Sequence, residues 1–79
     1  MTGHLIKRSL VLAGHSTSVA LEPEFWAVLD VMAVERRLPF SRLIEAIDRT
    51  RETDRPLASA LRIAALEKEI RGSGGLETG

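Results

Sequence analysis

The stretch S-T-S-V-A-L-E-P-E-F-W at residues 16–26, continued as R-R-L-P-F-S-R-L-I-E-A-I-D-R at residues 36–49, decides the fold of this chain. In its first six residues, small side chains (Ser, Ser, Ala) alternate with larger ones (Thr, Val, Leu), which is typical of a strand with one buried face. The rest has apolar residues at helical spacing in two segments that a proline separates. Because a lone strand leaves backbone N–H and C=O groups unpaired, the stretch predicts a partner strand from a second copy of the chain.

Alternation within residues 16–21 gives this strand two different faces. Thr17, Val19 and Leu21 share the face that we expect to be buried. The opposite face is available for contacts outside the domain, and it carries Ser16, Ser18 and Ala20.

The segment before this strand is also rich in strand-forming residues, but its apolar residues alternate in the opposite register along the sequence. Leu10 and Leu12 occupy even positions, whereas Val19 and Leu21 occupy odd ones, and one flat strand cannot bury both sets. A bulge at Gly14 would switch the buried face, and a tight turn there would fold the segment back as a hairpin. Of the possible arrangements we favour an extended arm.

Three helices follow in the sequence pattern. The first begins near Pro23 and ends at Leu38, before a second proline, and the second is short. A polar connection leads to Pro56, which starts a third helix that continues to about residue 71. The first helix has a core stripe with Trp26 at its margin. It also has a second apolar stripe, which we expect to pack against the third helix or another subunit and which comprises Ala27, Val31 and Val34.

The composition limits how the chain can be stabilised. A chain of 79 residues forms one small domain, and it has no cysteine for a disulfide. His4 and His15 lack further ligands nearby in sequence, so we predict no metal and no cofactor. Burial between subunits is therefore the expected source of additional stability.

Charge and hydropathy narrow the function classes. The formal net charge is zero, but residues 1–15 contain two basic residues and no acid, whereas residues 16–79 have nine basic and eleven acidic residues. No apolar run is long enough to cross a bilayer and no signal peptide is evident, so we expect a cytoplasmic protein without membrane contact. No catalytic motif or carboxylate pair is present, and we predict that the protein is not an enzyme.

The order of strand, proline-initiated helix, tight connection and second helix resembles the ribbon-helix-helix superfamily of Arc-type proteins. The sequence K-R-S-L-V-L-A-G-H-S-T-S-V-A-L-E-P-E-F-W at residues 7–26, with L-A-S-A-L-R at residues 57–62, is similar to that of small bacterial members of this superfamily that carry a third helix. The resemblance implies a mostly helical fold with one intermolecular β-ribbon, in a homodimer or a higher assembly. Its dimer core would comprise Val19, Leu21, Phe25, Leu29, Met32, Leu43, Ile44 and Ile47.

The resemblance further implies a transcriptional regulator whose ribbon enters the major groove of double-stranded DNA. Ser16, Ser18 and Ala20 would then face the base edges. Serine pairs with almost any base and alanine contacts only a thymine methyl, so this face predicts weak sequence readout. Phosphate contacts would come from the N-terminal segment and from the amides that open the second helix, at Lys7, Arg8, His15, Phe40, Ser41 and Arg42.

The second functional hypothesis is a protein-interaction or antitoxin-like module that binds a second protein and has weak or no DNA binding. The zero net charge and the second apolar stripes support it. In both cases the expected organisation is an N-terminal arm or extra strand at residues 1–15, a ribbon-helix-helix domain with a third helix at residues 16–71, and a flexible tail at residues 72–79.

Overall fold

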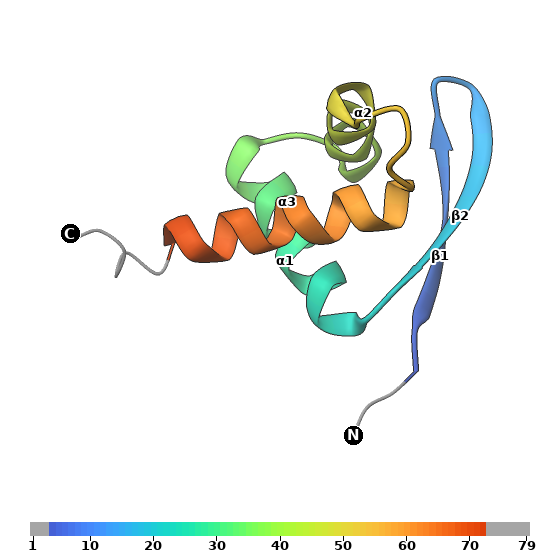
Figure 1. The fold of residues 1–79 in the computed structure, drawn as a ribbon. Coiled ribbons are helices and arrows are strands. Elements are labelled where there is room, and N and C mark those ends of the chain that lie inside the picture. Colours follow the sequence, from blue (N-terminus) through green and yellow to red (C-terminus); the bar gives the residue numbers. More distant parts are fainter. Residues whose placement is uncertain (1–3, 73–79) are drawn as a thin grey trace.

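The computed structural model describes residues 4–72, which form a two-stranded hairpin followed by three helices (Figure 1). The elements in chain order are β1 (Ile6–Leu12), β2 (His15–Leu21), α1 (Pro23–Arg36), α2 (Phe40–Thr50) and α3 (Leu57–Gly72). The hairpin stands along one side of the helical layer, as Figure 1 shows. The expected mostly helical fold with a third helix is confirmed. The predicted tail lies outside the described residues except for Gly72.

The partner of β2 is β1 of the same chain, so the prediction that its partner must come from a second copy is wrong. The strands pair antiparallel from Leu12 with His15 to Ile6 with Leu21. Ala13 and Gly14 form the two-residue turn with φ values of 52° and 83°, and positive φ at both positions is the requirement of a type I′ hairpin turn. The extended arm that we favoured is therefore also wrong, and the alternative hairpin is correct.

The hairpin resolves the mismatch in apolar parity. Each residue of β1 pairs with a residue of opposite parity in β2, so the even positions of β1 share a face with the odd positions of β2. Leu10, Leu12, Val19 and Leu21 are accordingly all buried against the helices. The reversal at the turn, rather than a bulge, is what allows both apolar sets to enter one core.

The core lies between the hairpin and the helices of a single chain. Trp26 is 2% exposed, as predicted for a core residue, and its Nε1–H donates a hydrogen bond of 2.7 Å to the backbone oxygen of Ile6. Of the eight residues assigned to a dimer core, Phe25 and Ile47 are half-buried and the others are buried without a second copy. These six are Val19, Leu21, Leu29, Met32, Leu43 and Ile44.

Prolines and a left-handed residue determine where α1 ends and α2 begins. Pro23 occupies the first turn of α1, as expected. Arg37 adopts φ 58° after the last turn, where its N–H donates to the oxygen of Val34 and the N–H of Leu38 donates to that of Ala33. This is the Schellman arrangement, at a position that glycine usually occupies. Pro39 then caps the start of α2.

The second apolar stripe of α1 is not covered by α3. Ala27 is exposed, and the side chains of Val31 and Val34 are 47% and 77% exposed. The prediction that α3 buries them is wrong, because α3 packs instead on the opposite side of α1 through Ala65 and neighbouring core residues. Burial against another subunit stays a prediction.

Ion pairs join α3 to the start and the end of α1. The Nε of Arg62 lies 2.9 Å from Oε1 of Glu22, and the Nζ of Lys68 lies 3.1 Å from Oε1 of Glu35. The bond to Arg62 lowers the pKa of Glu22 below its ordinary value. Within the described range, none of the helices is long and apolar enough to cross a bilayer.

Candidate nucleic-acid interface

The face of the hairpin that points away from the helices is the first part of the candidate interface. The pairing aligns Lys7 with Ala20, and it continues with two further outward pairs. The side chains of this face are exposed apart from Ala20, which is half-buried. The three predicted base-facing residues all belong to this outward face, which comprises Lys7, Ser9, Val11, Ser16, Ser18 and Ala20.

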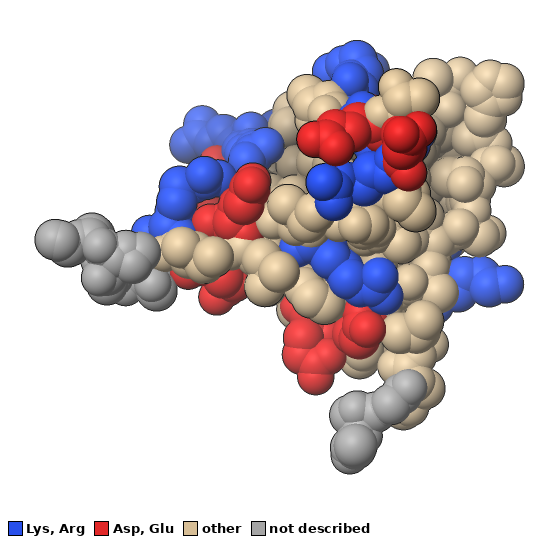
Figure 2. All heavy atoms as spheres, viewed as in Figure 1, with Lys and Arg blue, Asp and Glu red and all other residues tan. Residues whose placement is uncertain are grey.

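The outward face is small, mainly polar and nearly without charge, and its large apolar residue, Val11, is 58% exposed. Three of its side chains are serines, whose hydroxyl groups both donate and accept hydrogen bonds. Lys7 carries its one positive charge. The hairpin is accordingly drawn mostly in tan in Figure 2, whereas the acidic and basic side chains gather on the helices. Such a face can approach a polar surface closely, because it has no bulky side chain in the middle.

Arg8 lies on the inward face and has partners within the chain. Its two terminal nitrogens donate hydrogen bonds of 2.9 and 3.1 Å to the two carboxylate oxygens of Asp30. Its guanidinium also lies 4.7 Å from the ring centroid of Trp26 and 5.1 Å from that of Phe40. The bond to Asp30 raises the pKa of Arg8, although partial burial opposes this.

A phosphate contact by Arg8 therefore stays a prediction. For this contact to form, a DNA phosphate would have to compete with the Asp30 carboxylate for the guanidinium. The sequence does not indicate this competition, because Arg8 and Asp30 are 22 positions apart and no local pattern connects them. Lys7, on the outward face, has no such carboxylate partner among the described residues.

His15 and the turn form the exposed tip of the hairpin. His15 pairs with Leu12 at the first position of β2 and is exposed. The N–H of Ala13 donates a hydrogen bond of 2.9 Å to Oε2 of Glu45, which connects the tip to α2. Sequence reasoning missed Glu45, because a single acidic residue in a helix gives no signal for a contact 32 positions away.

The start of α2 is the second part of the candidate interface. No side chain caps it, and the N–H of Arg42 donates to the oxygen of Pro39 at 3.0 Å. The amide of Arg42 is thus used within the helix, and the phosphate contact that we expect at Arg42 stays a prediction. The amides of Phe40 and Ser41 precede the first helical hydrogen bond and remain the better candidates.

Packing against the hairpin fixes the position of this helix start. The ring of Phe40 lies 6.0 Å from that of Trp26, measured between centroids, and both rings contact the Arg8 guanidinium. The side chain of Arg42 is exposed and its Nε lies 4.0 Å from Oε1 of Glu45. The start of α2 is consequently held beside β1, close to Arg8.

Taken together, the fold and these two elements define a small domain that presents a polar strand face next to a free helix start. Residues 4–72 contain no cluster of side chains able to hold a metal ion. Residues 5–68 match the family described as Ribbon-helix-helix domain. The chain belongs to this family, whose members commonly bind DNA through a typically non-catalytic fold. Neither the curated proteins nor the solved structures gave a match to the chain.

Proposed function

We propose that this protein is a homodimeric transcriptional regulator that places the outward face of the β1–β2 hairpin in the major groove of double-stranded DNA. The observation that carries the proposal is the outward face itself, which is mainly polar, largely exposed and flanked by the start of α2. Strand readers of the major groove use such a face. Membership of the ribbon-helix-helix family gives independent support.

In this proposal, backbone contacts supply most of the affinity. Lys7 contacts a phosphate as a point charge, and the amides of Phe40 and Ser41 contact another at the positive end of α2. The serines at positions 16 and 18 contact base edges with little discrimination, because a hydroxyl group suits several acceptors and donors. We therefore expect the affinity for a specific DNA sequence to exceed the affinity for non-specific DNA by only a modest factor.

The homodimer forms part of the same proposal, since ribbon-helix-helix proteins generally dimerise. The exposed stripe of α1 is our candidate for the subunit interface. Val34 is 77% exposed and Val31 is 47% exposed in a single chain, and a second copy would remove both from water. Because these side chains are exposed, Val34→Glu should produce a folded monomer, which light scattering and circular dichroism together would detect.

Fluorescence polarisation with duplex DNA at 50 and 200 mM salt tests the DNA-binding proposal. Phosphate contacts predict a marked loss of affinity at the higher salt concentration. In Lys7→Gln the slope of log affinity against log salt should decrease by about one for each Lys7 that contacts a phosphate. Arg49→Gln is the matched control, because Arg49 is an exposed cation near the end of α2, away from the outward face. Absence of binding at 50 mM salt would refute the proposal.

The second candidate function is a protein-interaction or antitoxin-like module. The exposed apolar side chains of α1 and α3, which include Val34 at 77% and Leu66 at 50%, favour it, as does the zero net charge. Stoichiometric co-purification of a second protein, together with weak DNA binding, would support this candidate. Tight DNA binding by the chain alone would count against it.

A further inference from the structure

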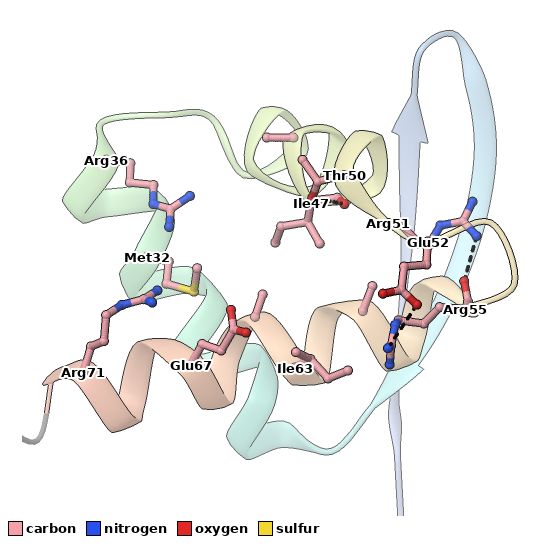
Figure 3. Close-up of a pocket in the computed structure, with 13 residues that line it drawn as sticks. Met32, Arg36, Ile47, Thr50, Arg51, Glu52, Arg55, Ile63, Glu67 and Arg71 are labelled. Carbon is pink, nitrogen blue, oxygen red and sulfur yellow. Dashed lines mark hydrogen bonds and ion pairs between the residues drawn. The ribbon is translucent and has the colours of Figure 1, made fainter. Parts of the chain in front are cut away.

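A hollow between the three helices has no role in the interface described above. It has a volume of about 520 Å³, within the range of about 300–1,000 Å³ that is usual for small-molecule sites. Side chains of α1, α2, α3 and the connection before α3 line it, and no strand residue takes part. Figure 3 shows the hollow with α3 along one side and α2 along the other.

The lining combines an apolar floor with basic groups. Met32, Ile47 and Ile63 contribute apolar side chains to the lining, together with small alanines of α2 and α3. Four arginines and two glutamates also line the hollow, which leaves a formal charge of +2. The hollow is thus suited to a molecule that has both an apolar part and negative charge.

Two of the four arginines are engaged within the chain. The Nε of Arg51 lies 2.9 Å from Oδ1 of Asp48, and its Nη1 donates a hydrogen bond to the backbone oxygen of Arg55. The Nη2 of Arg55 lies 3.5 Å from Oε1 of Glu52. These contacts hold Arg51 and Arg55 in place at one end of the hollow, and the dashed lines in Figure 3 mark the contacts of Arg51 with Arg55 and of Arg55 with Glu52.

Arg36 and Arg71 differ from this pair. Both are exposed, and neither forms an ion pair within residues 4–72. They come from the last turns of α1 and α3, and their side chains lie on either side of Met32 in Figure 3. A guanidinium group matches a carboxylate or phosphate with two parallel hydrogen bonds, so this end of the hollow offers two such groups to one anion.

We propose that this hollow binds a small anionic amphiphile, with its carboxylate or phosphate between Arg36 and Arg71 and its apolar chain on Met32, Ile47 and Ile63. The carboxylate of Glu67 also lines the hollow and opposes the anion. The proposal does not depend on DNA binding, since its site and the hairpin face have no residue in common.

Calorimetric titration of the full-length protein with octanoate, together with NMR chemical shifts, tests the site. Octanoate should bind and shift the signals of Met32 and Ile63, whereas acetate and octanol, which lack either the chain or the charge, should bind much more weakly. Arg36→Gln and Arg71→Gln should each weaken octanoate binding about tenfold, as expected for a lost hydrogen bond to a charged group. Octyl phosphate, compared with octanoate, distinguishes the two possible head groups.

Two further variants keep the test independent of folding defects. Glu67→Gln should strengthen octanoate binding, a gain that a damaged fold would not produce. Arg49→Gln, an exposed cation outside the hollow, should leave the affinity unchanged. Equal binding of octanol and octanoate, or no effect of Arg36→Gln and Arg71→Gln, would overturn the proposal. Chemical shifts in the hollow that change with protein concentration alone would assign it to a second copy and would also overturn it.

Discussion

Replacing Arg8 or Lys7 by glutamine separates a folding role from a DNA-binding role at two consecutive positions of one strand. Lys7 points outward from the hairpin, whereas Arg8 points toward the helices and contacts Asp30. Because both terminal nitrogens of Arg8 are bonded to Asp30, we expect Arg8→Gln to lower stability without changing the salt dependence of DNA binding. Lys7→Gln should reduce that salt dependence without lowering stability. Each variant thereby serves as the control for the other.

The magnitude for Arg8→Gln follows from its contacts. The side chains of Arg8 and Asp30 are 36% and 49% exposed, so solvent screens their pair and it contributes at most about 1 kcal/mol. Contact of the guanidinium with two aromatic rings adds about 0.5 kcal/mol or more. A loss of about 1 kcal/mol lowers the melting temperature of a domain of this size by roughly 4–8 °C.

Thermal unfolding followed by circular dichroism, and polarisation with duplex DNA at several salt concentrations, measure the two effects. Combining Arg8→Gln with Asp30→Asn should give less destabilisation than the sum of the single changes, since both remove the same pair. The reasoning is refuted if Arg8→Gln leaves the melting temperature unchanged and flattens the salt dependence, because Arg8 would then contact DNA rather than stabilise the fold.

Three further changes test the hairpin and its support. Ala13→Gly should raise the free energy of unfolding by about 0.5–1 kcal/mol in urea titrations, since Ala13 has φ 52° and glycine adopts this conformation without strain. The bond between Glu22 and Arg62 lowers the pKa of Glu22, so its stabilising effect is complete above the unfolded pKa near 4.5 and is lost as pH falls through the lowered value. As the pH falls below 4.5, the melting temperature of Glu22→Gln should therefore decrease less than that of the wild type. The same decrease in both proteins would contradict this. Val19→Asp should cost several kcal/mol because Val19 is 7% exposed in the core, and retention of the wild-type melting temperature would argue against that packing.

Local patterns predicted the helices well. Pro23 and Pro39 mark helix starts because proline fits the first turn and disfavours helical dihedrals in the residue before it, and both effects act on neighbouring residues. The burial of Trp26 followed equally from its place at the edge of an apolar stripe. The outward orientation of Ser16 and Ser18 required only strand alternation.

Contacts between distant parts of the chain were not predictable in the same way. The parity change around Gly14 indicated that the chain must reverse or bulge there, but it gave no preference for a strand partner from the same chain. The contacts of Arg8 with Asp30 and of Ala13 with Glu45 depend on how α1 and α2 pack, which no local pattern specifies. The apolar stripe at Val31 and Val34 predicted a neighbour, and in a single chain these residues face solvent.

Pairing within the chain also has a consequence for the kinetics of folding. The two strands are joined by only two residues, so the hairpin closes in a unimolecular step at a rate that does not depend on protein concentration. Association through the exposed face of α1 would be a separate, bimolecular step that slows on dilution. Refolding at a series of protein concentrations should accordingly separate a constant fast phase from a slower phase whose rate rises with concentration.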